Sequence, residues 1–503
     1  MEAVAVINMK KIGIIIAFIV TSVSFAQQDS TTVYKKRVLE STEIDFLLSY
    51  YSQDGDNASV TGGIGTEELT DITPTIVVSY PLNDDDILTV DFGISSYTSA
   101  SSSNLNPWDS SGASNGEDDD DDDDEDDDDD GFRNADSVIE GSPWVASSGA
   151  SEQDVWVGGS VSYSHSSDDR NFIWSGHVSF STEYDYTSIG FGGAVTKLFN
   201  EKNTEISIGA QAYIDTWNPQ YPTELDSYLE AEGDLNDGFF SGVTIWGVND
   251  ADEIYAIDKS GDPLTNWAPE NFSLISDKGR NSYSTTINFS QILSKKAQFS
   301  LFLDVVYQQG WLANPMQRVY FADKNNYYIG NPDDIPVYET KENMGVFHLA
   351  DDIERLPDTR FKTPIGFRFN YFINEFLIIR TYYRYYFDDW GVNSHTANIE
   401  IPIKIGGKFT IYPSYRYYTQ TAADYFAPYN EHLSTSEFYT SDYDLSEFDA
   451  NQYGFGVSYT DIFTKAHVWK FGIKNIDLRF HQYDRSNGLS AWIISGGIKF
   501  VMQ

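Results

Sequence analysis

Apolar and polar residues alternate with a period of two along most of this chain. In residues 43–50, Ile44, Phe46 and Leu48 alternate with Asp45 and Ser49. This period is typical of a β-strand with one apolar and one polar face. Sixteen such segments are predicted, at residues 43–50, 69–80, 87–98, 155–164, 172–183, 187–199, 204–216, 281–293, 297–309, 361–372, 376–387, 395–405, 409–419, 452–460, 475–483 and 489–502.

The connections between these segments mostly alternate between tight turns and long loops. Residues 200–203 and 294–296 are tight turns, whereas the longest connections are 99–153, 217–279, 311–359 and 420–448. Short turns at one rim and long loops at the other are typical of a transmembrane β-barrel. We therefore expect an all-β fold, a single transmembrane antiparallel β-barrel of about 16 strands with short periplasmic turns and long extracellular loops.

The N-terminal region predicts export. Lys10 and Lys11 precede the apolar run 12–20, which is too short to span a bilayer, and small residues surround Ala26. A signal peptide is thus expected at residues 1–26 and a barrel at 27–503, in the outer membrane of a Gram-negative-type bacterium. No other apolar run reaches about 18 residues, which excludes a helical membrane protein.

Composition and charge narrow the class of function. The chain has no cysteine, 66 Tyr and Phe residues and a net charge of −45, which remains −31 without the acidic run 117–130. Nucleic acid is excluded as a partner because a phosphate backbone requires basic surface. Catalysis is not expected either: the seven histidines are scattered, and no G-x-S-x-G or H-E-x-x-H motif occurs.

The polar faces of the predicted strands carry charges of opposite sign in two halves of the barrel. The later strands place basic residues inward, namely Lys362, Arg368, Arg380, Arg384, Lys404, Arg416 and Arg479. The earlier strands place acidic residues inward, namely Asp45, Asp91, Glu205 and Asp304. Opposed walls of opposite sign would create a transverse field across a wet lumen, and such a field selects solutes by charge.

Three interpretations of these charges stay open. They pair with one another and rigidify the barrel, they line a pathway for solutes, or they form the seat of a plug or partner. About sixteen strands enclose an aqueous channel unless loops fold into it.

The acidic run lies in the loop 99–153. Asp126, Asp128 and Asp130 imitate the front half of an EF-hand loop, but Ser137 stands where the twelfth-position Glu is required. A solvated, extended segment and a weak, multivalent Ca²⁺ binder both fit so dense a run of carboxylates. No other cofactor is expected.

Aromatic residues gather in the outer loops and near the outer ends of strands. In the loops they fit either mutual packing or a glycan or protein partner. Tyr382, Tyr383, Tyr385 and Tyr386 are predicted to belong to an aromatic girdle at the membrane interface.

The last strand resembles the C-terminal assembly signal of outer-membrane proteins, with Ser495, Gly497, Phe500 and Met502 at the matching positions, although Met502 replaces the usual aromatic. This resemblance implies outer-membrane lipid and the barrel-assembly machinery as partners. In alternation and inward charge the chain resembles porin-like barrels, and its acidic, Tyr-rich loops are similar to those of an uncharacterised family of outer-membrane barrels. A porin-like channel for small hydrophilic solutes is expected. The alternative is a plugged barrel that acts as scaffold or receptor for surface lipoproteins, cations or glycans.

Overall fold

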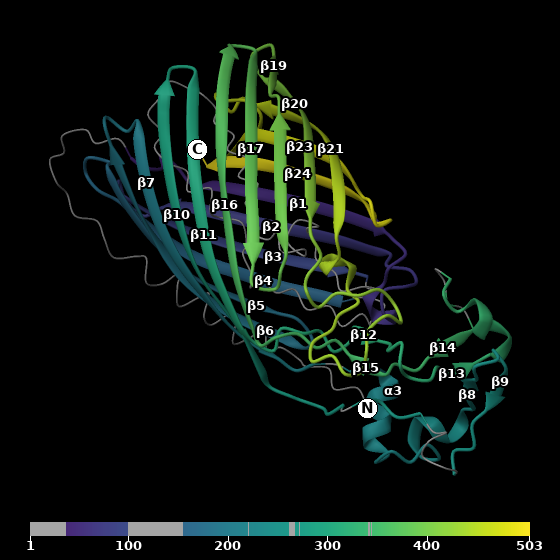
Figure 1. The fold of residues 1–503 in the computed structure, drawn as a ribbon. Helices are drawn as coiled ribbons and strands as arrows, with labels where there is room; N and C mark the ends of the chain where they lie inside the picture. The colour runs from purple at the N-terminus through teal and green to yellow at the C-terminus, as the bar shows by residue number, and fades with distance from the viewer. Residues whose placement is uncertain are drawn as a thin grey trace. The chain divides into compact units, whose positions relative to one another are not determined.

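In the computed structural model, the strands form one closed antiparallel barrel (Figure 1). The structure describes residues 37–98, 154–219, 221–260, 267–270, 272–340, 343 and 345–502. The predicted signal peptide, the loop 99–153 and with it Asp126, Asp128 and Asp130 lie outside these residues. The barrel strands are β1 (Glu43–Asp54), β2 (Leu69–Pro81), β3 (Asp86–Tyr97), β4 (Asp154–Ser166), β5 (Phe172–Thr182), β6 (Tyr186–Phe199), β7 (Thr204–Trp217), β10 (Lys278–Ser294), β11 (Ala297–Gly310), β16 (Thr359–Asn374), β17 (Leu377–Asp388), β18 (Asn393–Glu400) with β19 (Ile403–Ile405), β20 (Phe409–Gln420), β21 (Phe448–Thr460), β23 (Phe471–Arg485) and β24 (Ser490–Met502).

Pairing of the first and last strands closes the barrel. β1 pairs with β24 from Glu43 opposite Val501 to Asp54 opposite Ser490. β18 and β19 both pair with β17 and β20 and occupy one position, so the barrel has sixteen positions, as predicted. The predicted strand 395–405 is divided because Pro402 has no N–H to donate to the sheet. Closure leaves the sheet without an open edge, which a hydrocarbon environment requires.

The outward face of the barrel is apolar and exposed. Phe180, Ile189, Leu478 and Trp492 are all more than half exposed and alternate with more buried neighbours along their strands. Such a band is the surface that lipid tails contact. No helix in the described parts of the chain is long and apolar enough to cross a membrane.

The two rims of the barrel differ as predicted. One rim carries short turns, such as residues 200–203 and 295–296, and a slightly longer connection that contains β22 (His467–Val468). The other carries the connections 55–68, 218–277, 311–358 and 421–447. We refer to these as the periplasmic rim and the outer rim.

The outer connections form secondary structure that the sequence pattern did not predict. Four short strands make a separate sheet in the order β14, β13, β8, β9, and two more pair as β12 with β15. These elements are η1 (Ser59–Thr61), α3 (Thr223–Glu230), η2 (Gly238–Gly242), β8 (Ile245–Val248), β9 (Ile254–Ala256), β12 (Arg318–Val319), β13 (Tyr327–Gly330), η3 (Pro332–Val337), β14 (Val346–His348), β15 (Asp352–Ile353) and η4 (Tyr443–Leu445). We call the described residues of the four connections the loop cap.

The prediction that four tyrosines of β17 form an interfacial girdle is wrong for two of them. Tyr386 is fully buried, and Tyr382 stacks on Phe302 of β11 with ring centroids 5.6 Å apart. The alternation of the strand sends Tyr383 and Tyr385 outward and these two inward, so the cluster divides between both faces.

Candidate functional site

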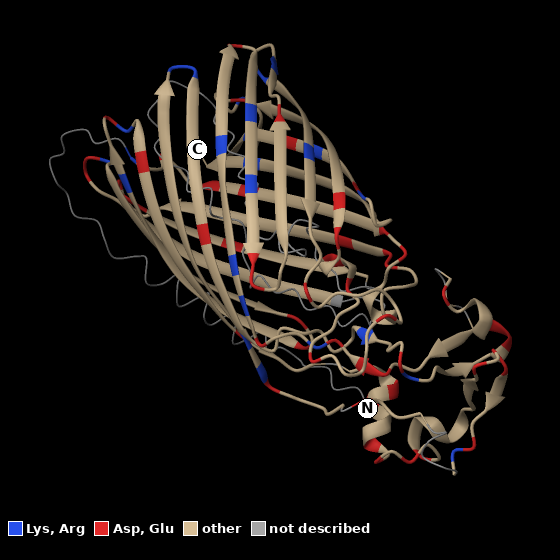
Figure 2. Cartoon of the chain, in the orientation of Figure 1, with Lys and Arg blue, Asp and Glu red and all other residues tan. Residues whose placement is uncertain are grey.

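The basic residues predicted for the lumen lie on the inner face of β16 to β23. Lys362, Arg384, Arg416 and Arg479 are buried there, whereas Arg368, Arg380 and Lys404 are partly exposed. Blue bands in Figure 2 mark the cations of β16 and β17. Each alternates with outward apolar residues, which is why one strand presents both a lipid face and a charged face.

Carboxylates bind some of these cations. Glu400 of β18 lies between two arginines, 3.2 Å from Nη1 of Arg380 and 3.0 Å from Nη1 of Arg479. Nε of Arg479 also lies 3.0 Å from Asp477. A carboxylate shared by two guanidinium groups ties β17 and β18 to β23, from which β18 is separated by β20 and β21, and leaves a net positive charge.

The predicted acidic residues also lie on the inner face, but they do not form one continuous wall. Asp45 lies 3.5 Å from Lys499, Asp91 accepts hydrogen bonds from the backbone and hydroxyl of Ser160, and Glu205 is opposite Ser290. Asp304 is hydrogen-bonded to Thr286 and interacts with Arg368 and Arg384. Each of these four acidic residues therefore has its own neighbouring residue, and together they do not form one continuous negatively charged surface.

The inner face from β11 to β23 has an excess of positive charge below its outer rim. Among the described residues of this region, the seven predicted basic residues face three carboxylates, those of Asp304, Glu400 and Asp477. Local pairing thus accounts for only part of the charge. A water-filled space beside this wall would favour anions.

Burial of the inner face changes with depth. Within the described residues, fifteen barrel strands have a buried inner-face side chain at the outer end, namely Gln53, Leu69, Tyr97, Ser181, Tyr186, Trp217, Arg280, Gln308, Arg360, Tyr386, Ser394, Gln420, Phe448, Tyr483 and Ala491. Nearer the periplasmic rim the inner face is mixed: Ser49, Glu205 and Arg380 are partly exposed and the inward-facing Leu47 is 41% exposed, whereas Ile173, Thr196, Leu198 and Ser458 are buried. Side chains and loops therefore fill the outer end, whereas in the periplasmic half water reaches part of the inner face.

Contacts between connections join the loop cap into one body. Arg318 pairs with Glu224 of α3 at 2.8 Å and donates to the carbonyl of Val60. Glu354 accepts hydrogen bonds from the backbone of Asn314 at 2.8 Å and from the hydroxyl of Thr440 at 2.6 Å. All four connections take part, so the cap should move as a unit.

Several carboxyl groups of the cap are buried among its packed connections. Burial raises the pKa of Glu354 to about 7, of Asp351 to about 7 and of Asp352 to about 6. Burial also raises the pKa of Asp442 well above its usual range, and the nearby charge of Asp444 adds to this effect. A protonated carboxyl is cheaper to bury than a charged one, so the closed cap favours protonation.

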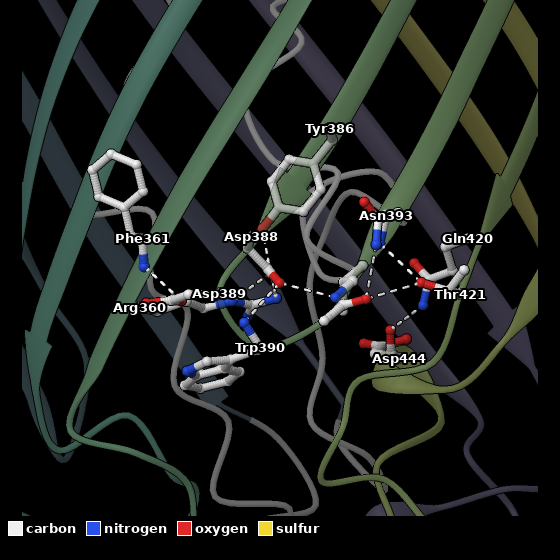
Figure 3. Close-up of polar contacts among 12 residues, drawn as sticks. Arg360, Phe361, Tyr386, Asp388, Asp389, Trp390, Asn393, Gln420, Thr421 and Asp444 are labelled. Carbon is white, nitrogen blue, oxygen red and sulfur yellow. Dashed lines mark hydrogen bonds and ion pairs between the residues drawn. The ribbon is translucent and has the colours of Figure 1, made fainter.

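The cap is fastened to the barrel by a hydrogen-bond network at the ends of β16, β17, β18 and β20 (Figure 3). Asp388 is its centre: it accepts from Nε and Nη2 of Arg360 at 2.9 and 2.5 Å and from the hydroxyl of Tyr386 at 2.7 Å. It also accepts from the backbone N–H groups of Trp390 and Val392, which lie in the connection 389–392 outside the cap. The carbonyl of Trp390 in turn accepts from the backbone N–H of Asp424 in the cap, so Asp388 acts on the cap through this connection. On β20, Gln420 donates to the carbonyls of Asp444 and Ser446 in the cap. We call the pair Arg360 and Asp388 the rim latch.

Substitution of Asp388 should loosen the rim. Asp388→Ala leaves the guanidinium of Arg360 buried without its carboxylate, and breaking a buried ion pair from one side costs about 3 to 5 kcal/mol. Hydrogen exchange of residues 389–392 and 311–358 is expected to rise by more than tenfold. Asp389→Ala is the control because Asp389 is exposed and accepts one backbone hydrogen bond, from Phe361. Equal exchange in both variants would show that the latch does not hold the cap.

Comparison with known proteins places the chain in a family. Residues 12–503 match the family model described as "Protein of unknown function (DUF3570)". The chain belongs to this family. No curated protein matches it.

Solved structures resemble this DUF3570 protein only distantly. A bacterial polysaccharide outer membrane secretin has a TM-score of 0.39 at 9% identity, and the match covers 91% of this chain and 98% of the secretin chain. A FadL homologue of Pseudomonas aeruginosa has 0.36 at 9% identity, covering 92% and 91%. OccAB1 of Acinetobacter baumannii has 0.32 at 10% identity, covering 94% and 99%. No functional argument rests on similarities this weak.

The terminal residues of the DUF3570 protein lie where the barrel closes. Ser495 and Gly497 lie opposite Ser49 and Leu47 of β1, and Phe500 lies opposite Ile44. Phe500 shares the outward face with Met502, which is 43% exposed. Their role as an assembly signal stays a prediction.

Sequence reasoning missed the rim latch and the buried carboxyls of the cap. Arg360 lies one residue before the predicted strand 361–372, and Asp388 lies one residue after 376–387. If the predicted strands 361–372 and 376–387 had each been extended by one residue at the outer end, the alternation would have placed Arg360 and Asp388 on the inner face. Glu354 and Asp442 lie in connections without periodicity, so no pattern marks them as buried.

Proposed function

We propose that this protein is an outer-membrane channel for small hydrophilic solutes, with a net positive lumen and an outer mouth that opens when the loop cap rearranges. The observation that carries the proposal is the change of burial with depth. At the outer end, fifteen of the barrel strands have a packed inner-face side chain among the described residues, whereas in the periplasmic half some inner-face side chains, such as Leu47 and Arg380, are exposed to water. A packed mouth above a charged, partly exposed inner face is the arrangement expected of a channel whose mouth opens and closes.

Planar-bilayer recording tests this proposal. Purified, folded protein should give discrete conductance steps with a low open fraction, and Asp388→Ala should raise that fraction because it loosens Trp390 and Val392, which cluster with Leu312 and Leu445 of the cap. Asp389→Ala should leave it unchanged. Silent bilayers with both variants, while heat-modifiable migration on gels shows folded barrels, would contradict a channel.

A receptor or scaffold remains the second candidate, and one observation favours it. The cap has its own sheet, α-helix and aromatic core, and it exposes Phe239, Tyr255 and Leu433. Exposed aromatic and aliphatic side chains on a rigid surface suit a protein partner such as a surface lipoprotein. Silent bilayers together with another chain that stays bound after detergent extraction would favour this candidate.

A further inference from the structure

We propose that the lumen contains a binding site for a small oxyanion, a carboxylate or a phosphate, at Arg384, Thr396 and Arg416. This site rests on the proposed channel function and names its class of solute. Its three residues come from the neighbouring strands β17, β18 and β20.

The strand register brings the three side chains together. Arg384 lies opposite Thr396, and Arg416 lies opposite Asn398, the next inner-face residue of β18. Directly opposite residues have Cβ atoms about 5 Å apart and diagonal ones about 7 Å apart. The register therefore places two arginines on the strands either side of one threonine, and planar guanidinium donors match the geometry of carboxylate and phosphate oxygens.

The hydroxyl of Thr396 is the observation that points to a ligand. Thr396 is 2% exposed, and its Oγ1 has no hydrogen-bond partner in the structure. Buried polar groups are nearly always satisfied, so an unsatisfied one in a charged region marks the place of a missing partner. A donor between two arginines suits an anion oxygen.

This part of the wall has more cations than carboxylates. Glu400 is bound to Arg380 and Arg479 one step closer to the periplasm, and Asp304 interacts with Arg384 and Arg368 from β11. The region retains four more cations than carboxylates among the described residues. A solute that enters from the periplasmic half passes the partly exposed Arg380 and Lys404 before it reaches this site.

Calorimetry on the full-length protein in detergent tests the site with inorganic phosphate and succinate as probes. Both should bind, and more weakly at high salt. Thr396→Val keeps the shape but removes the hydroxyl, and it should weaken binding roughly tenfold. Arg384→Gln with Arg416→Gln should weaken it further.

Ser394→Ala is the matched control. Ser394 is on the same strand and face, is 1% exposed and also has an unsatisfied hydroxyl, but it lies opposite Tyr386 and Gln420 rather than between arginines. Its substitution should leave affinity within about twofold of the unsubstituted protein. Thr396→Ser keeps the hydroxyl and should retain binding. This result would show that Thr396→Val acts by removing the hydroxyl and not by changing the packing.

The outcomes separate the site from the channel. Absence of heat with both probes, or equal effects of Thr396→Val and Ser394→Ala, would exclude the anion site. Neither result would contradict a channel that conducts ions in bilayers. Binding with the expected variant pattern supports the site even where bilayers are silent, because calorimetry does not require passage.

Discussion

Replacing Arg380 and Arg384 with glutamate is expected to shift the ion preference of the protein in a bilayer from anions towards cations. Below its outer rim, the inner wall from β11 to β23 has the seven predicted cations and three carboxylates among the described residues. Two such substitutions leave five of each, so the excess of four positive charges disappears. The carboxylate introduced in place of Arg380 would also lie opposite Glu400, where two like charges repel.

The measurement is the reversal potential in a tenfold gradient of KCl. The unsubstituted protein should be anion-selective, and the double variant should move by tens of millivolts in the cation-selective direction. Lys295→Glu with Lys465→Glu is the control because it changes the net charge equally at two exposed positions of the periplasmic rim. An equal shift in the control would mean that overall charge, and not the lumen wall, sets selectivity.

Raising the pH is expected to loosen the loop cap. Burial raises the pKa of Glu354 from 4.5 to about 7, and neighbouring Asp351 and Asp352 shift in the same direction. In the window between about 4.5 and 7 the closed cap holds more protons than the open cap, so closing weakens as pH rises and the loss is complete above about 7. For Glu354 alone the change is on the order of 3 kcal/mol.

Cysteine labelling can measure this loosening because the chain has no cysteine of its own. Ala350→Cys places a thiol at a fully buried position beside Asp351, and Ser436→Cys places one at an exposed position of the cap. The ratio of their maleimide labelling rates removes the pH dependence of the thiol itself. This ratio should rise at least tenfold between pH 5 and pH 8.

Glu354→Gln identifies the group responsible. An amide has nearly the same shape, stays neutral and can still accept the hydrogen bond from the backbone of Asn314. The variant should therefore show a smaller rise, because only Asp351 and Asp352 still lose their protons. The same rise in the variant as in the unsubstituted protein would exclude Glu354 as the titrating group.

The interior of the loop cap shows why part of this protein was beyond prediction from sequence. The cap is held by contacts between residues far apart in the chain, such as Val60 with Arg318 and Glu354 with Thr440. Each participant looks like an ordinary polar residue of a loop. Only the packing of four connections against one another buries them and shifts their proton affinity.

The sequence by itself determined the sixteen strands, their lipid and lumen faces, and the difference between a rim with short turns and a rim with long loops. It could do so because hydrocarbon on one side and water on the other impose a strict period of two on every strand. The tertiary structure alone decided that the outer mouth is packed, that Asp388 fastens it and that Thr396 lies between Arg384 and Arg416. Those features depend on strand register and on contacts between distant loops, which no local period encodes.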